Sequence, residues 1–200
     1  ISCSRHFKRE LCFLGAASAG LRPVLPPQAS LAATAAMCYI KKQIGNSCLV
    51  GEGKQLNITI RKMAESDAEA LYRLLSDLAV MQYLEPPFDK AQTEAFLRRA
   101  GLSTPPLVYA AEENGTFIGY VIYHPYDEQS VEIGWVLFPS YWGRGYASAL
   151  TDQLIRRAKE EQKSVVIECA PAQTATARIA LKKGFRSCGI CDGLAVYRLT

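Results

Sequence analysis

The sequence predicts an α/β protein built on a mixed sheet that helices flank. Three observations lead to this prediction. Segments with a two-residue apolar period alternate with segments of helical period, turns rich in Gly and Pro separate them, and 49% of the chain is hydrophobic. This apolar content and the length of 200 residues suit the packed core of one ordinary domain. Strands and helices in such an order pack as layers, with helices covering the sheet.

The predicted order begins with a strand and two helices. Residues 57–63 alternate as a strand. The sequence Ser66-Asp-Ala-Glu69 is typical of a capping box, so we expect a helix that runs to about residue 78. Asp89 is expected to cap a second helix, which runs through residue 100. The inward stripe of this second helix repeats at helical spacing and consists of Thr93, Phe96, Leu97 and Ala100.

Strands dominate the rest of the chain. Residues 107–111 and 116–123 are expected to pair across Asn114-Gly115, a strong hairpin signal. A second tight turn, Asp192-Gly193, is expected to close the last hairpin. The other expected elements are a strand over 131–137, a helix over 146–159, a strand over 165–169, a helix over 174–183, and the hairpin strands 185–190 and 194–199.

A glycine turn joins the strand 131–137 to the helix 146–159. Gly143 and Gly145 have no side chains, so their backbone N–H groups can approach a ligand closely. The first N–H groups of a helix are unpaired and carry about half a positive charge, which suits a phosphate. The turn therefore predicts a site for a phosphate-bearing cofactor. As a structural alternative, it is simply a tight connection.

Two familiar phosphate-binding loops are absent. The P-loop sequence Gly-x-x-x-x-Gly-Lys-Ser/Thr does not occur. The dinucleotide fingerprint requires a third glycine, and Ser148 stands at that position. An enzyme that uses ATP or a dinucleotide is therefore a weaker alternative.

Three motifs resemble those of the GNAT N-acetyltransferase superfamily over residues 57–200. Trp142-Gly-Arg-Gly-Tyr-Ala147 matches its acetyl-CoA motif Gln/Arg-x-x-Gly-x-Gly/Ala, with Trp142 in place of the usual Gln or Arg. Glu132-Ile-Gly-Trp-Val-Leu-Phe-Pro139 is similar to the fourth strand of the family, and Leu181-Lys-Lys-Gly-Phe185 to its late Gly-Phe signature. The resemblance is in particular to the ribosomal-protein and small-amine acetyltransferase branch. It implies a GNAT-like mixed, mostly antiparallel central sheet.

The resemblance also implies an activity: direct transfer of acetyl from acetyl-CoA to a primary amine, on a small molecule or a peptide N-terminus. Backbone N–H groups of the turn would hold the diphosphate, with Arg144 adding charge or remaining a solvated loop cation. The pantetheine arm would pair with the strand end as an added strand does, and the N–H of Leu137 would face the thioester oxygen. The cofactor-binding residues expected in this way are Trp135, Val136, Leu137, Trp142, Gly143, Arg144, Gly145, Tyr146, Ala147, Gln173 and Thr176.

Three further residues depart from the family pattern. Gln173 and Thr176 stand where relatives often carry Pro-x-Asn-x-x-Ser, and both can simply start a helix. Ala180 stands where many relatives place a tyrosine acid, so the proton donor to the thiolate is unassigned. Tyr141 is conceivable in that role, but we expect it to pack on the sheet. These departures support one alternative function, a non-catalytic acyl-CoA-binding or sensory module.

Glu132 is the candidate general base. On a strand, its side chain shares a face with Gly134 and Val136. A carboxylate in an otherwise apolar central strand is costly unless it is solvated or used, and Gly134 leaves room for a substrate. The alternative is a glutamate paired with a cation on a neighbouring strand. For the acceptor pocket, the segment 83–88 is a further candidate, in which Glu85 could attract a cationic amine or be a solvated loop acid.

The positive charge of the chain lies in its first part. Residues 1–55 hold 7 Lys/Arg and 2 Asp/Glu, whereas residues 56–200 hold 16 and 17. Neither part has a basic stripe interleaved with aromatic residues, so nucleic-acid binding is not expected. No apolar run approaches the roughly 20 residues of a membrane-spanning helix, so no membrane partner is expected. The sequence makes no prediction of oligomeric state.

Residues 1–55 are expected to be a leader that is disordered or non-native, and residues 56–200 to be the acetyltransferase domain. The apolar run 11–21 after a basic start imitates a signal peptide, and the scarcity of acidic residues imitates an organellar transit peptide. Met37 is a candidate start of the native chain.

Cysteines and histidines predict no metal site. Four of the seven cysteines lie in the leader, which leaves Cys169, Cys188 and Cys191 without histidine partners. Cys169 is expected to be a small buried thiol, and Cys188 and Cys191 a reduced pair. His6 and His124 have no ligand-like neighbours in the sequence and are interpreted as surface or loop residues. Reduced thiols suit the cytoplasm, where acetyl-CoA is found.

Overall fold

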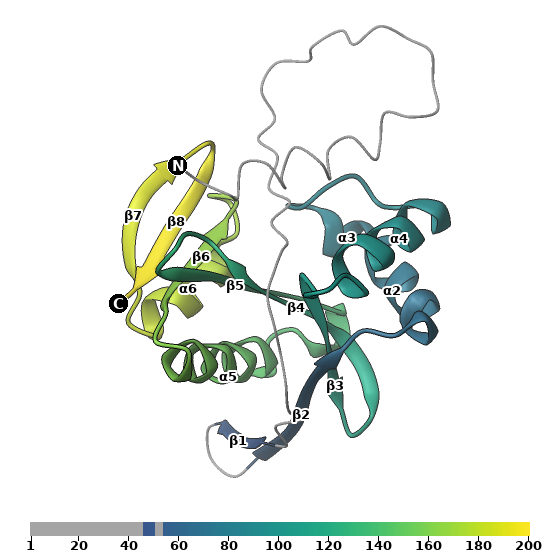
Figure 1. The fold of residues 1–200 in the computed structure, drawn as a ribbon, viewed down its shortest axis with the longest axis horizontal. Helices are drawn as coiled ribbons and strands as arrows, with labels where there is room; N and C mark the ends of the chain where they lie inside the picture. Colours follow the sequence, from purple (N-terminus) through teal and green to yellow (C-terminus); the bar gives the residue numbers. More distant parts are fainter. Residues whose placement is uncertain (1–45, 51–53) are drawn as a thin grey trace, which may run out of the picture.

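The computed structural model describes residues 46–50 and 54–200 (Figure 1). The expectations for Met37, for the apolar run 11–21, for His6 and for the first three cysteines lie outside the described residues.

One mixed sheet runs through the described part of the chain. Its eight strands lie in the order β1-β2-β3-β4-β5-β6-β8-β7. Every neighbouring pair is antiparallel except β5 and β6, which are parallel. The strands are β1 (Asn46–Val50), β2 (Lys54–Lys62), β3 (Val108–Glu113), β4 (Thr116–Pro125), β5 (Ser130–Leu137), β6 (Ser164–Cys169), β7 (Arg186–Cys191) and β8 (Leu194–Leu199). The prediction of a mixed, mostly antiparallel sheet is therefore confirmed. β1 lies ahead of the expected domain boundary at residue 56.

Both predicted hairpin turns form as the sequence indicates. Asn114 and Gly115 have φ values of 50° and 78°, and Asp192 and Gly193 have 51° and 83°. Two consecutive residues with positive φ produce the turn whose twist matches that of paired strands, and Asn-Gly and Asp-Gly tolerate this backbone best.

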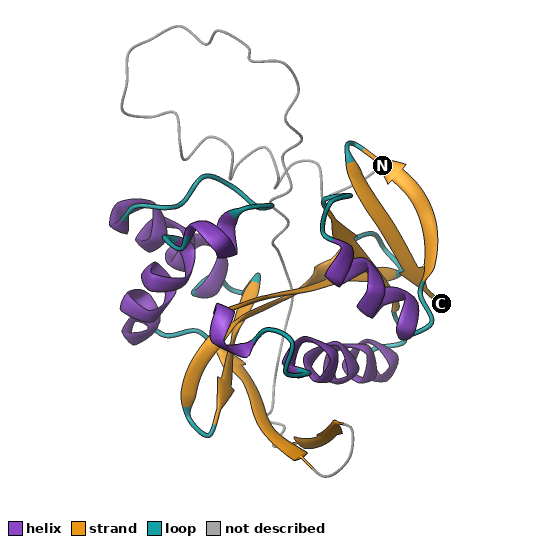
Figure 2. Cartoon of the chain, turned by 180° about the vertical axis from the view of Figure 1, so that it is seen from behind, coloured by secondary structure: helices purple, strands orange, loops and turns teal. Residues whose placement is uncertain are grey.

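Helices cover both faces of the sheet (Figures 1 and 2). They are α2 (Ala68–Leu75), α3 (Leu78–Met81), α4 (Lys90–Phe96), α5 (Tyr146–Glu160) and α6 (Thr174–Lys182). Short helical turns occur at η2 (Glu65–Asp67), η3 (Leu97–Gly101) and η4 (Pro139–Tyr141). The predicted cap of α4 is confirmed, since the Asp89 side chain accepts from the N–H of Gln92 at 2.8 Å.

The start and end of the first helix differ from the prediction. The expected capping box at Ser66 does not form, because Asp67 accepts from the N–H of Ala64 at 2.8 Å and the helical turn begins at Glu65. Arg61 of β2 holds Asp67 in this position with two hydrogen bonds of 2.7 Å. At the other end the helix stops at Leu75, because Asp77 caps the separate helix α3.

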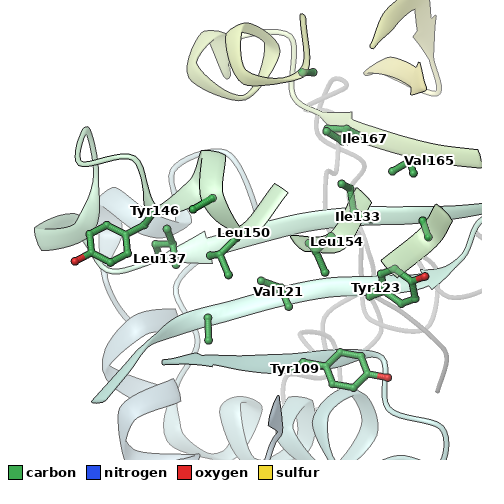
Figure 3. Close-up of a cluster of buried hydrophobic side chains, with 14 of the residues drawn as sticks. Tyr109, Val121, Tyr123, Ile133, Leu137, Tyr146, Leu150, Leu154, Val165 and Ile167 are labelled. Atoms are coloured by element: carbon green, nitrogen blue, oxygen red, sulfur yellow. The ribbon is translucent and has the colours of Figure 1, made fainter. Parts of the chain in front are cut away.

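Two apolar cores lie on opposite faces of the sheet. The α5 core joins α5 and α6 to alternate residues of the strands, among them Val121, Ile133 and Leu137 (Figure 3). The α2–α4 core joins the helices α2, α3 and α4 to the strand residues that point to the other face of the sheet, such as Tyr120 and Val136. The four residues of the predicted α4 stripe are all buried in this second core or beside it. Each side of β5 thus meets a different layer of helices.

Candidate active site

The strands β5 and β6 separate partway along their length. They pair only at Ser130 with Ser164, Val131 with Val165, and Glu132 with Val166. Beyond Glu132, β5 continues to pair with β4 on its other side as far as Leu137, while β6 continues beside β8 to Cys169. We call this divergence the fork. Within the described part of the chain, the second half of β5 has no strand on its fork side.

Two residues of this half-strand direct backbone groups into the fork. The N–H of Phe138 donates to the carbonyl of Ile118 in β4 at 3.1 Å. Because N–H directions alternate along a strand, the N–H groups of Leu137 and Trp135 point the other way, toward the fork. Val136 turns its backbone toward β4. A ligand with amide groups can add to such an open edge as an extra strand does.

The glycine turn lies between the end of β5 and the start of α5. Gly143 and Gly145 have φ values of 68° and 90°, which a residue with a side chain rarely adopts. A Cβ atom at Gly143 would meet nothing within 4 Å, so the backbone and not the available space requires glycine there. No described backbone carbonyl accepts from the N–H of Gly143, Arg144 or Gly145. The turn therefore presents free N–H groups at the start of a helix of 15 residues.

Arg144 adds a positive charge to this turn. Its guanidinium donates to the carbonyl of Ser140 at 2.8 Å and lies over the rings of Tyr141 and Tyr146, at 5.6 and 5.4 Å from their centroids. Tyr141 is half-buried and packs edge-on against Tyr146, with 5.0 Å between ring centroids. Arg144 is thus an exposed but ordered cation beside the free N–H groups, rather than a freely solvated one.

Trp142 and Tyr146 attach the turn to the sheet. The indole Nε1 of Trp142 donates to the carbonyl of Leu137 at 2.8 Å, while the residue remains 48% exposed. Tyr146 is fully buried, and its hydroxyl donates to Glu113 of β3. Burial and the bond to Glu113 raise the pKa of Tyr146 to about 12. The next residue, Ala147, packs against the α5 core. The start of α5 is therefore held at a fixed place beside the fork.

Glu132 lies where the fork opens, and its neighbour across the sheet is His124. The two residues are directly opposite in the pairing of β4 with β5, and the Nε2 of His124 is 2.9 Å from the Oε2 of Glu132. Only 1% of Glu132 and 3% of His124 is exposed. The prediction of a surface or loop position for His124 is wrong, because β4 runs on to Pro125 and carries His124 on the same face as Tyr120 and Ile122. The signal in the sequence was the apolar run 120–123, which leads into His124 with no turn residue between.

A polar cluster continues from this pair onto β6 and β8. The hydroxyl of Tyr126 donates to Glu168 at 2.8 Å, and the guanidinium of Arg198 lies 5.0 Å from the centroid of the Tyr126 ring. Arg198 also contacts Asp127 at 3.3 Å. Burial, Glu168 and Glu132 all raise the pKa of Tyr126. The sequence analysis did not predict this cluster, although Glu168 interrupts the apolar run of β6.

Gln173 and Thr176 lie at the start of α6. The side chain of Gln173 accepts from the N–H of Ala170 at 3.0 Å, and its own N–H donates to the carbonyl of Ala170 at 2.8 Å. Gln173 is thus engaged in the turn before the helix, as the structural alternative expected. Thr176 is half-buried in the first turn of α6.

Ala180 and Cys169 both belong to the α5 core. Ala180 is fully buried and offers no proton donor. Cys169 is 4% exposed, and burial raises its pKa to about 11, which suits the expected inert thiol better than a nucleophile. Cys188 and Cys191 are free and exposed on β7.

The segment 83–88 contains a carboxylate in an unusual environment. The Oε1 atom of Glu85 is buried and has no hydrogen-bond partner among the described residues, and desolvation raises the pKa of the group. The segment is linked to the sheet by a row of rings: Phe88 contacts Phe96 at 6.2 Å, and Phe96 contacts Tyr120 of β4 at 5.6 Å between centroids.

Among the residues that the structure describes, no group of three or more His, Cys, Asp or Glu side chains is arranged to hold a metal ion. No helix in this part of the chain has the length and apolar character needed to cross a bilayer.

Known proteins share this architecture. A family model described as an acetyltransferase (GNAT) domain matches residues 57–186. The Bacillus subtilis (strain 168) protein described as uncharacterized N-acetyltransferase YnaD is 28% identical over 134 residues, which cover 64% of this chain and 79% of that protein. A GNAT-family acetyltransferase from Bacillus anthracis superposes with a TM-score of 0.63 and 26% identity, over 71% of this chain and 93% of that one.

A structure of yncA, a putative acetyltransferase from Salmonella typhimurium with its cofactor acetyl-CoA, superposes with a TM-score of 0.51 and 23% identity, over 72% of this chain and 94% of that one. At this identity the likeness shows the fold alone. The family model spans well over half of the chain and includes the fork and the glycine turn. The chain therefore belongs to the GNAT acetyltransferase family and is an acetyl-CoA-dependent N-acetyltransferase.

Proposed function

We propose that the protein transfers acetyl directly from acetyl-CoA to the primary amine of a small molecule or a peptide N-terminus, at the fork between β5 and β6. The observation that carries this proposal is the arrangement of three features in one place. The glycine turn lies at one end of the open β5 edge, the edge itself has free amide groups, and Glu132 lies at the other end.

The residues present fit acetyl-CoA as the acyl donor. The N–H groups of Gly143, Arg144 and Gly145 are free to bind the diphosphate, and the Arg144 cation stands beside them. The backbone groups of Trp135 and Leu137 are directed to where the pantetheine arm would pair. The bound cofactor supplies the activated acetyl group. What the chain contributes is orientation of that group and donation of a hydrogen bond to its oxygen from Leu137.

Glu132 acts as the general base in this proposal. Only a neutral amine can attack the thioester, and the fraction that is neutral depends on the acceptor. An α-amine with a pKa near 7.8 is about one-seventh neutral at pH 7, whereas a lysine side chain near 10.4 is neutral in only about one part in 2,500. Because the side chain of Glu132 is just 2% exposed, the proton is expected to reach it through one bridging water.

The test has two stages. Calorimetry with acetyl-CoA measures cofactor binding, and a thiol-release assay then measures free CoA while peptide N-termini, polyamines, amino acids and antibiotic amines are offered in turn. Binding without CoA release from any amine would instead favour a non-catalytic acyl-CoA-binding module. Absence of binding at millimolar acetyl-CoA would contradict the site itself.

Substitution of the proposed base adds a sharper test. Glu132→Gln is expected to lower kcat by about 10²–10⁴-fold, which is the usual contribution of a general base. Glu160→Gln is the matched control, because Glu160 is exposed at the end of α5 and takes no part in the fork. An unchanged kcat and an unchanged pH–rate profile for Glu132→Gln would exclude Glu132 as the base.

The cytoplasm is the compartment that we propose. Cys169, Cys188 and Cys191 are free thiols in the structure, which suits a reducing compartment that contains acetyl-CoA.

A further inference from the structure

We propose that His124 is a positioning residue for Glu132, and that its ring is a protonated imidazolium whose Nε2 atom lies against the carboxylate. The imidazolium keeps Glu132 ionised and oriented in a buried site, so that the carboxylate can accept a proton. This inference rests on the function proposed above for Glu132. It concerns a residue that neither the sequence motifs nor the family match singles out.

The first step of the argument is the tautomer of His124. Its Nδ1 atom is 2.7 Å from the carbonyl oxygen of Pro125. A carbonyl oxygen can only accept, so Nδ1 must carry a hydrogen. In a neutral imidazole with hydrogen on Nδ1, the other nitrogen, Nε2, has a lone pair and no hydrogen.

The second step is what Nε2 faces. It lies 2.9 Å from the Oε2 of Glu132, which is also an acceptor when the carboxylate is ionised. The oxygen lies off the direction of an ideal ring N–H bond, so the contact is an ion-pair contact rather than a well-directed hydrogen bond. Both atoms are buried, and neither has a hydrogen-bond partner among the described residues. A bare ring nitrogen so close to a buried carboxylate oxygen would bring two electron-rich atoms together, whereas a positively charged ring offsets the charge of the carboxylate.

The third step is which of the two groups holds the proton. An isolated imidazole is more basic than an isolated glutamate carboxylate by about two pKa units. Burial penalises a lone charge of either sign, but an adjacent opposite charge offsets the penalty for both. The proton is therefore assigned to the ring, which gives an imidazolium–carboxylate pair with no net charge.

Other charged groups around the pair have partners of their own. Tyr126, just after β4, donates to Glu168 of β6, and Arg198 of β8 contacts Asp127. At the next position on the same face of β5, Gly134 carries no polar side chain. A Cβ atom there would lie closest to the apolar side chain of Ile122. Among the described residues, His124 is thus the cation that the structure places on Glu132.

The proton balance of the acetyl transfer follows from this assignment. The acceptor ammonium loses one proton to the carboxylate of Glu132. The neutral amine would then form the new C–N bond as the C–S bond of the thioester breaks, and its second proton would pass to the departing thiolate to give free CoA. The pair then consists of an imidazolium and a carboxylic acid, with a net charge of one, and it returns to the resting state when the acid releases that proton to solvent. His124 keeps its own proton throughout.

Nitrogen NMR of the histidine ring tests the assignment without depending on activity. The chain contains two histidines, so a His6→Gln variant labelled with ¹⁵N-histidine reports on His124 alone. At mildly alkaline pH, where a free imidazole is neutral, both ring nitrogens of His124 should show attached hydrogen. In the same protein with Glu132→Gln, Nε2 should lose its hydrogen while Nδ1 keeps it. A bare Nε2 in the protein that retains Glu132 would overturn the proposal.

Kinetics test the consequence for catalysis. His124→Leu should lower kcat by about 10²-fold or more while the KM for acetyl-CoA stays within about twofold, because the glycine turn is untouched. The double variant His124→Leu, Glu132→Gln replaces the pair with two neutral groups and should be no slower than the slower single variant. Losses that multiply in the double variant would show independent roles and contradict a pair.

The two hypotheses can fail separately. If no amine is acetylated by any form of the protein, the proposed function fails, while the NMR result still decides the state of His124. If Glu132→Gln is inactive but His124→Leu is fully active, Glu132 remains the base and the positioning role of His124 is excluded. Thermal unfolding of each variant confirms that the comparison is between folded proteins.

Discussion

Gly143 allows a quantitative test of the cofactor cradle. Its φ of 68° lies in the left-handed region, which costs a residue with a side chain about 1–2 kcal/mol. A Cβ atom there would touch nothing within 4 Å, so Gly143→Ala changes the backbone energy without creating a clash. The turn is exposed, so the free protein can relax the strain, whereas phosphate binding requires the glycine conformation. At about 1.4 kcal/mol per tenfold, the Kd for acetyl-CoA should rise by about 5–30-fold.

Gly115 provides a matched control for this experiment. It has a φ of 78°, is exposed in the β3–β4 hairpin, and likewise has nothing within 4 Å of a Cβ atom. Gly115→Ala should lower the free energy of unfolding by about 1–2 kcal/mol and leave the Kd for acetyl-CoA unchanged. Calorimetry on both variants separates strain at the cofactor site from strain elsewhere. Equal affinity of Gly143→Ala and the parent protein, or an equal loss in both variants, would refute the cradle.

Two further predictions concern the contacts that hold the site in place. Burial tends to raise the pKa of Asp67, but the hydrogen bonds from Arg61 and from the N–H of Ala64 outweigh it and hold the pKa below its ordinary value of 3.8. The ion pair therefore contributes its full stability above pH 3.8, and this contribution is lost as the pH falls through the lowered pKa of Asp67. Asp67→Asn should reduce the free energy of unfolding at neutral pH. It should also make that free energy decline less steeply in acid, as measured by urea unfolding. An acid decline as steep as that of the parent protein would contradict this origin. Tyr146→Phe removes a partly buried hydrogen bond to the Glu113 carboxylate and should cost about 1.5–3 kcal/mol in the same assay. A loss below about 0.5 kcal/mol would show that Glu113 finds another partner.

Short-range patterns predicted the parts of the site that a few neighbouring residues determine. The glycine turn at Gly143 and Gly145, the start of α5 at Tyr146 and the two faces of β5 all agree with the sequence. Each depends on local backbone preference or on a period of two or 3.6 residues. The finer placement in the ribosomal-protein and small-amine branch stays a prediction.

Errors arose where a distant residue competed with a local signal. Arg61 on β2 binds Asp67, and this moves the start of the helical turn away from the Ser66 capping box. The hydrogen bond between Tyr146 and Glu113 joins residues 33 positions apart, and no periodicity indicates it. Gln173 is not such an error: its side chain accepts from the nearby N–H of Ala170, and its contact with the cofactor stays a prediction.

The sequence by itself determined most of the order of the elements and the turn that can receive a phosphate, because backbone preferences and apolar periods act within a few residues. The family was indicated by the resemblance of its motifs and shown by the family model. The tertiary structure alone decided where β5 parts from β6 and that His124 lies against Glu132. Those features depend on the register between strands. Register is set by the packing of two helical layers on opposite faces of the sheet, a property of the whole chain that no local window contains.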